Sequence, residues 1–157
     1  MSCRYISIHD YDIKQADGIS VSVWMQGCPH RCKGCYNPET WNMDVTAGLE
    51  FTNETIEHVI KLLGNGEVKK NLSILGGEPL LTRNLQMLTT LCKRARDTYP
   101  DIQIWLWTGY SYDEVKHLEI IKELDYVIDG KYIEELRELS RYKGSSNQNV
   151  IQIRTTI

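Results

Sequence analysis

The sequence lacks the features that mark membrane-spanning, secreted and nucleic-acid-binding proteins. Its 18 Lys and Arg residues are outnumbered by 21 Asp and Glu residues, giving a formal net charge of −3 and no basic footprint for nucleic acid. No stretch approaches the ~18 apolar residues of a membrane span, and the first residues contain no apolar core of a secretory signal. We therefore expect a cytoplasmic protein that binds neither nucleic acid nor a membrane.

The chain also lacks internal repeats, low-complexity tracts and linkers. Its 157 residues are the length of a single domain, which we expect to cover residues 1–157. A domain of this size buries about 70% of the surface that its unfolded chain exposes, so it can support its own core.

The number and spacing of the cysteines do not indicate a disulfide framework. There are five cysteines, and an odd number counts mildly against complete pairing. In the reducing compartment expected here, clustered cysteines bind metals or take part in catalysis more often than they form disulfides.

Apolar runs that favour strands alternate along the chain with patterns that favour helices. This alternation indicates βαβ units and a parallel sheet. A closed eight-stranded barrel takes about 250 residues and at least ~200, so the sequence predicts an α/β fold with a partial, open β/α barrel and a mainly parallel sheet. The expected strands cover residues 5–8, 19–25, 72–75, 102–107, 126–128 and 150–153, and the expected helices cover 53–63, 85–95, a segment opening at Ser111, and 133–139.

Chemically suggestive residues recur where the expected strands end. The segments are 28–35, 76–79, 108–109 and 129–131. In α/β sheets and barrels the carboxyl ends of parallel strands share one edge, where active sites are placed. We therefore expect these four segments to meet.

Three cysteines, Cys28, Cys32 and Cys35, lie within eight residues directly after an expected strand. Iron–sulfur clusters are held by cysteine thiolates, usually four. Three thiolates would hold a cubane cluster while leaving one iron without a protein ligand, and that open position would admit another molecule.

Tetrahedral zinc is the main alternative for this loop. Structural zinc takes four ligands, usually from two close pairs, and no second pair is recognisable. His30 lies between two of the cysteines, where reaching the same metal is sterically awkward. The spacing favours iron–sulfur but leaves zinc open. The isolated candidates for a fourth ligand are His30, Cys3, His9 and Cys92, and Cys92 falls on the apolar face of its expected helix, as a small buried hydrophobe would.

The spacing Cys28-x3-Cys32-x2-Cys35 resembles the signature of the radical S-adenosylmethionine enzymes. The resemblance implies a [4Fe–4S] cluster on these cysteines, with S-adenosylmethionine chelating the fourth iron. Many members have an aromatic residue before the third cysteine, where this chain has Gly34, with Tyr36 just after the cysteine.

The segment Gly76-Gly77-Glu78-Pro79 matches a second motif of that superfamily. The match implies that Gly76, Gly77 and Glu78 orient the methionine part of the cofactor. Glycines allow close approach of the backbone, and a carboxylate complements an ammonium group. Taken alone, the same four residues would be read as an ordinary turn.

A narrower resemblance is to the activating proteins of anaerobic ribonucleoside-triphosphate reductases, and it covers nearly the whole chain. It implies an enzyme, a radical S-adenosylmethionine oxidoreductase, that cleaves the cofactor reductively to methionine and a 5′-deoxyadenosyl radical. That radical would take a hydrogen atom from a glycine of the partner, the large glycyl-radical subunit of the reductase. An electron donor such as flavodoxin is implied too. The residues that carry the resemblance are 28–41, 107–110, 129–132 and 143–148.

Five further residues are predicted to bind the cofactor: Thr108, Asp129, Lys131, Tyr36 and Asn37. Thr108 would approach the ribose or the methionine carboxylate, and Asp129 would bond a ribose hydroxyl or help to shape the site. Lys131 would pair with the carboxylate or contact the partner, and Tyr36 would pack over the cluster or serve the partner interface. Solvated turns or core packing would explain the same residue types. Three other functions stay open: an activase of a formate-lyase-type enzyme, a zinc-binding adaptor domain, and a plain electron carrier.

Overall fold

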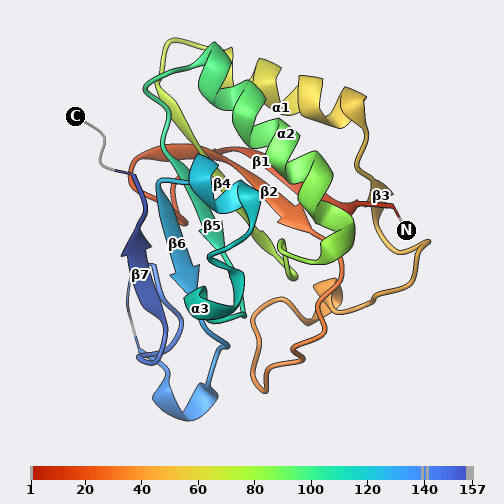
Figure 1. Ribbon diagram of the computed structural model, residues 1–157, viewed down its shortest axis with the longest axis vertical. Helices are drawn as coiled ribbons and strands as arrows, with labels where there is room; N and C mark the ends of the chain where they lie inside the picture. Colours follow the sequence, from red (N-terminus) through yellow and green to blue (C-terminus); the bar gives the residue numbers. More distant parts are fainter. Residues whose placement is uncertain (1, 139, 141, 155–157) are drawn as a thin grey trace.

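A seven-stranded sheet with two long helices on one face forms the protein (Figure 1). The computed structural model describes residues 2–138, 140 and 142–154. Within these residues no helix is both long and apolar enough to cross a membrane. The strands are β1 Arg4–Asp12, β2 Ile19–Met25, β3 Leu49–Glu50, β4 Lys70–Gly76, β5 Ile104–Trp107, β6 Tyr126–Asp129 and β7 Asn149–Gln152; the α-helices are α1 Asn53–Gly64, α2 Thr82–Thr98 and α3 Tyr112–Val115; the 3₁₀ helices are η1 Pro38–Thr40, η2 Glu119–Glu123 and η3 Glu134–Leu136.

The strands run in the order β3-β1-β2-β4-β5-β6-β7, so the sheet is open. The four central strands, β2, β4, β5 and β6, are parallel, which confirms the α/β class. The outer strands β1, β3 and β7 pair antiparallel, so the sheet is less uniformly parallel than expected. The short connection from β1 to β2 explains part of this difference, because parallel neighbours need a crossover of a dozen or more residues. The resemblance of this open sheet to a partial β/α barrel stays a prediction.

One face of the sheet is aliphatic and packs against α1 and α2. Alternate residues of each strand point to it: Val23 in β2, Ile74 in β4 and Leu106 in β5 are all fully buried in the main core. The helices lie side by side over this face (Figure 1). Cys92 of α2 is also fully buried there, as expected.

The opposite face carries serine and aromatic side chains instead. Ser22 and Ser73 are fully buried on it. Trp105 stacks on Tyr126 with ring centroids 4.1 Å apart, and Trp107 continues the stack. No described α-helix longer than one turn covers this face, which leaves room for a cavity at the edge where the parallel strands end.

The helices expected after β5 and β6 are much shorter in the structure. The helix opening at Ser111 is the single turn of α3, and the Ser111 side chain makes no capping hydrogen bond. The expected helix over 133–139 is only η3, and Leu139 lies outside the described residues. Here tertiary pairing competes with helix formation, because the Ile133 amide donates to Ser145 Oγ and Arg137 forms a bridge with Ser145.

Candidate functional site

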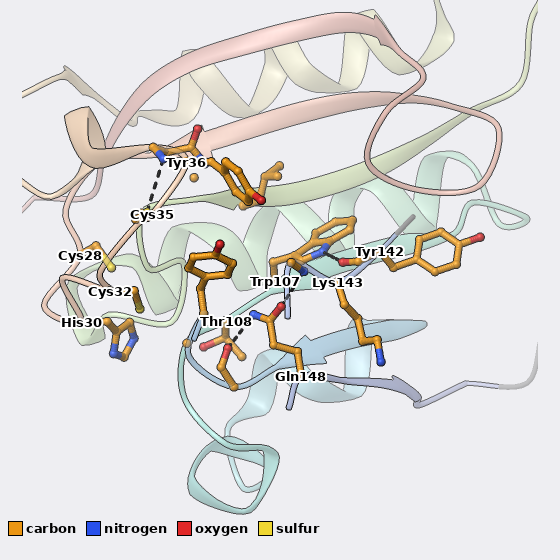
Figure 2. Close-up of a pocket in the computed structure, with 18 of the residues that line it drawn as sticks. Cys28, His30, Cys32, Cys35, Tyr36, Trp107, Thr108, Tyr142, Lys143 and Gln148 are labelled. Atoms are coloured by element: carbon orange, nitrogen blue, oxygen red, sulfur yellow. Dashed lines mark hydrogen bonds between the residues drawn. The ribbon is translucent and has the colours of Figure 1, made fainter. Parts of the chain in front are cut away.

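The four segments singled out in the sequence meet at the carboxyl edge of the parallel strands. They follow β2, β4, β5 and β6 in turn, and they surround a cavity of about 290 Å³. Figure 2 shows the cysteines on one side of this cavity and Tyr142, Lys143 and Gln148 on the other. The lining residues are Gln15, Cys28, His30, Cys32, Cys35, Tyr36, Asn37, Leu75, Gly76, Gly77, Trp107, Thr108, Gly109, Gly130, Tyr132, Tyr142, Lys143, Gly144 and Gln148.

We call the residues of 28–37, 76–78 and 108–109 the first wall. Its cysteine loop is closed at the base by two main-chain hydrogen bonds: Gly27 N donates to Thr40 O over 2.6 Å, and Cys28 N donates to Trp41 O over 3.4 Å. The Gln26 side chain donates to two more carbonyls of the loop. The fold therefore fixes both ends of the loop that carries the cysteines.

Cys28, Cys32 and Cys35 are free thiols, half-buried, and all three line the cavity. Among the described residues, no three His, Cys, Asp or Glu side chains converge closely enough to hold one metal ion. A tetrahedral zinc site gathers all its ligands at one ion, whereas a cubane cluster takes each thiolate on a different iron. The three thiols that line the cavity are the candidate ligands for such a group.

Main-chain amides lie close to the sulfurs of the cysteine loop. Asn37 N donates to Cys35 Sγ over 3.4 Å, and the main-chain amide of Tyr132 acts to lower the pKa of Cys32. Burial raises the pKa of the Cys28 and Cys32 thiols, while these amide donors, which include His30 N at Cys28, act in the opposite direction. Hydrogen bonds to sulfur stabilise the thiolate form that binds metal.

The other two cysteines are isolated from the cavity. Cys3 and Cys92 are buried in the core, and burial raises the pKa of each to about 12. Neither is placed to serve as a fourth ligand. The nitrogen Nε2 of His30 is also engaged, because it lies 2.6 Å from Glu78 Oε1.

Glu78 is a fully buried carboxylate with four hydrogen-bonding partners. Its Oε1 accepts from Gly109 N at 2.7 Å and pairs with His30 Nε2. Its Oε2 accepts from Leu80 N at 2.9 Å and from Thr108 Oγ1 at 2.7 Å. Glu78 is outside the lining of the cavity. The carboxylate expected to face the cofactor is thus directed at the neighbouring loops.

Gly76 and Gly77 expose main chain to the cavity. A Cβ atom on Gly77 would lie 2.4 Å from Gly27 O and 3.1 Å from Thr40 O, at the base of the cysteine loop. Only glycine permits this approach without a shift of backbone. The Gly-Gly pair therefore packs the end of β4 directly against the cysteine loop.

We call the described residues between 130 and 148 the second wall; these are residues 130–138, 140 and 142–148. Gln148 holds it together: Nε2 donates to Gly130 O at 2.9 Å, and Oε1 accepts from Gly144 N at 2.8 Å. Asn147 Nδ2 donates to Lys131 O at 2.8 Å. Neutral amide side chains thus fasten the turn after β6 to the segment that precedes β7.

Two predicted cofactor residues, Asp129 and Lys131, lie outside the lining. Asp129 is buried, and its carboxylate accepts from Tyr112 N at 2.7 Å and from the main chain and side chain of Asn149. It therefore caps α3 and joins β6 to β7. Lys131 is exposed, with its positive charge near the Cys32 sulfur.

Tyr36, Asn37 and Thr108 do line the cavity, as their predicted role requires. Tyr36 is 67% exposed at the rim, where its ring lies 5.4 Å from that of Tyr132. Sequence reasoning missed the lining role of Tyr132 and Gln148, although both lie in segments that carry the family resemblance. It also missed Tyr142, for which the sequence held no signal.

Comparisons with known proteins agree with this site. The family model described as a 4Fe-4S single cluster domain matches residues 15–151, which include both walls. A protein of Enterobacteria phage T4 named anaerobic ribonucleoside-triphosphate reductase-activating protein is 35% identical over 94% of this chain and 92% of its own length.

Proteins of the same name give matching results in two bacteria. The one from Escherichia coli (strain K12) is 33% identical over 96% of this chain and 99% of its own length. The one from Pasteurella multocida is 33% identical over 92% of this chain and 94% of its own length. The chain belongs to the family of anaerobic ribonucleoside-triphosphate reductase-activating proteins. The resemblance first noted in the sequence is confirmed.

The family model and the cysteine loop both indicate an iron–sulfur site. The model is described as a 4Fe-4S single cluster domain, and the described residues supply three thiols to one cavity. A cluster held by three thiolates alone would keep one iron without a thiolate.

Proposed function

We propose that this protein activates an anaerobic ribonucleoside-triphosphate reductase by generating a glycyl radical on it, with S-adenosylmethionine as the radical source. The observation that carries the proposal is the set of three free thiols facing one cavity whose floor is exposed glycine main chain. A cluster bound there lacks one protein ligand, and the cavity offers space beside it. The relatives' shared name supplies the partner.

When bound, the [4Fe–4S] cluster supplies the electron that splits S-adenosylmethionine into methionine and a 5′-deoxyadenosyl radical, which takes a hydrogen atom from a glycine of the partner. The chain's own residues bind and orient. Cys28, Cys32 and Cys35 hold the iron. Gly76 and Gly77 offer main-chain groups to the methionine part, since both face the cavity.

The remaining predicted residues either line the cavity or act on it through neighbouring loops. Thr108 lies at the cavity edge, near the expected ribose or carboxylate. Tyr36 and Asn37 shield the cluster at the rim, and Lys131 offers charge beside Cys32. Asp129 and Glu78 act through the loops that they hold, because both are outside the lining.

The open sheet suits a substrate that is a protein loop. We propose one domain over residues 1–157, a shortened relative of the β/α barrel, whose cavity stays accessible to the partner's glycine loop. The partner is the large glycyl-radical subunit of the reductase. The electron donor is a small redox protein such as flavodoxin, and the reaction takes place in the cytoplasm.

Electron paramagnetic resonance tests the proposal directly. The reconstituted, reduced protein is mixed anaerobically with S-adenosylmethionine and either an anaerobic ribonucleoside-triphosphate reductase or a formate-lyase-type enzyme. A glycyl-radical doublet is expected in the mixture with the reductase and not in the mixture with the formate-lyase-type enzyme. A doublet only with the formate-lyase-type enzyme would reassign the partner, and no doublet with either would refute radical transfer.

Metal and product analysis separates the other functions. The cluster predicts roughly four irons and four sulfides per chain, whereas one zinc in a colourless protein would favour an adaptor domain. Release of 5′-deoxyadenosine after dithionite and S-adenosylmethionine are added is expected. A reduced cluster that leaves S-adenosylmethionine intact would identify a plain electron carrier.

A further inference from the structure

His30 occupies an unusual place for a residue between two metal-binding cysteines. Its side chain is only 6% exposed, and Nε2 lies 2.6 Å from Glu78 Oε1. A Cβ atom on Gly109 would lie 2.4 Å from the His30 ring, and the Tyr110 ring packs edge-on against it at 4.7 Å between centroids. The imidazole is thus enclosed by the loop that follows β5.

Glu78 links this histidine to the rest of the first wall. The same carboxylate oxygen that meets His30 also accepts the Gly109 amide, and the second oxygen accepts the Leu80 amide and the Thr108 hydroxyl. Hydrogen bonds to a charged acceptor are among the stronger ones in proteins. The ends of β4 and β5 and the first part of the cysteine loop, at His30, are therefore joined at one buried group.

We propose that His30 and Glu78 are a pair of positioning residues that fixes the geometry of the cysteine loop against the end of β5, and that the Glu78 side chain acts on the cluster site in this way and not through contact with the cofactor. The pair holds the first part of the loop, between Cys28 and Cys32, whereas the Gly27–Thr40 bond closes the base of the loop. Cys28 and Cys32 flank His30 in the chain, so their sulfurs are placed through it. The inference rests on the proposed function only for the presence of the cluster.

The chemistry of the pair predicts which substitutions matter. The Leu80 and Gly109 amides can only donate, so each carboxylate oxygen must accept. Glu78→Gln replaces one acceptor oxygen with an NH2 group, which sets two donors against each other in a buried space where an unpaired group is costly. His30→Ala removes the contact with the loop, while His30→Gln retains an N–H donor.

The experiment compares four variants with matched controls after anaerobic reconstitution: His30→Ala, His30→Gln, Glu78→Gln and the double variant of His30→Ala with Glu78→Gln. Iron per chain, the resonance spectrum of the reduced cluster without S-adenosylmethionine, and the dissociation constant for S-adenosylmethionine are measured. Glu134→Gln serves as the control because Glu134 also contacts the cysteine loop, through Lys33 Nζ at 3.9 Å, but is partly exposed. His9→Ala controls for loss of an imidazole elsewhere.

We expect His30→Ala and Glu78→Gln to change the cluster spectrum alike and to lower iron content at least about twofold, with the double variant no worse than the poorer single variant. Residues that act through one contact are non-additive in this way. His30→Gln should restore most of the wild-type spectrum, and both controls should match wild type. Hydrogen exchange of the Gly109 amide in the apo protein should quicken at least about tenfold in Glu78→Gln, since its acceptor is altered.

Two results would overturn the inference. One is a Glu78→Gln protein with a wild-type cluster spectrum and weaker S-adenosylmethionine binding, which would assign Glu78 to cofactor contact. The other is additive effects of the two substitutions. If Glu78→Gln fails to fold, the comparison of His30→Ala with His30→Gln decides, and equal spectra would count against a positioning role. Glycyl-radical formation is not among these measurements, so failure to activate a reductase would refute the proposed function and leave this test unaffected.

Discussion

The first wall of the cavity is fastened by a buried charge, and the second wall is fastened by neutral side chains near the surface. Glu78, with no exposed surface, joins three segments of the first wall. In the second wall Gln148 and Asn147, both half-buried, bridge the turns. A buried carboxylate with every partner in place tolerates little change, because an unmatched group there is costly. The hydrogen bonds of half-buried amide side chains cost less free energy to break, because water can replace the lost partner. The second wall is therefore the one better suited to change its conformation.

The largest effect in this comparison is expected from the first wall's thiols. Cys32→Ala should abolish cluster binding and cleavage of S-adenosylmethionine, because two thiolates remain for the cluster. Iron analysis and absorption after anaerobic reconstitution measure the loss. Cys92→Ala is the matched control and should retain iron, since Cys92 lies in the core. Full iron content in Cys32→Ala would remove this residue from the ligand set.

The next effect distinguishes the loop cysteines from the buried ones. In native apo protein, iodoacetamide should modify Cys28, Cys32 and Cys35 at least about tenfold faster than Cys3 and Cys92, because thiolates react and burial disfavours the thiolate form. Burial raises the pKa of Cys3 and Cys92 to about 12. Mass spectrometry of tryptic peptides measures the rates. Five equal rates in the folded protein would contradict the structure.

A pair of glycine substitutions compares the stiffness of the two walls. Gly77→Ala should lower the free energy of unfolding by about 1–3 kcal/mol, as overpacking does, because its Cβ would meet the Gly27 carbonyl at 2.4 Å. Gly144→Ala should cost no more than about 0.5 kcal/mol, since its nearest neighbour, at 3.0 Å, is the Tyr132 side chain. Urea unfolding of the apo protein measures both. Equal losses would mean that the walls are equally rigid.

The last expected effect concerns the hydrogen bonds that fasten the second wall. Gln148→Ala should leave iron content unchanged and weaken S-adenosylmethionine binding about five- to thirtyfold, equivalent to the ~1–2 kcal/mol of one or two net hydrogen bonds. Gln152→Ala is the control, because that side chain donates to Arg154 O and lies outside the lining of the cavity. Loss of iron in Gln148→Ala would show that the second wall also supports the cluster.

Much of the first wall could be predicted from the sequence because its signals are local. The spacing of Cys28, Cys32 and Cys35 places three thiols on one loop, and Gly76-Gly77 marks a close approach of backbone. Parallel strands then bring these segments to one edge without further information. The strands β2, β4, β5 and β6 were therefore expected near their observed positions.

The partners of the buried carboxylates could not be predicted. His30 and Glu78 are 48 residues apart, and Asp129 reaches Asn149 across an antiparallel pairing. Such contacts depend on which loops meet at the sheet edge and leave no pattern in a single sequence. Glu78 is assigned to the cofactor by the match of Gly76-Gly77-Glu78-Pro79 to a motif of the superfamily, and Asp129 is assigned because it is a polar residue at the end of an apolar strand. In the structure each one binds neighbouring backbone amides.

The loop that forms the second wall could not be predicted from the sequence for another reason. The stretch after β6 has helical periodicity, but the Ser145 hydroxyl accepts the Ile133 amide and draws the chain into a bridge with Arg137. Tertiary contacts of this kind override local propensity in short segments. The resulting loop brings Tyr142 and Gln148 to the cavity from a region with no periodic signal.

The main-chain bonds between Gly27 and Thr40 and between Cys28 and Trp41 have a consequence for assembly. They close the cysteine loop within the folded protein, so the entropy of bringing its ends together is lost when the sheet forms and not when iron arrives. Metal centres that must also fold their chain use part of the binding free energy for that task. Here the apo protein should remain folded after oxidative loss of the cluster and should accept a new cluster without refolding.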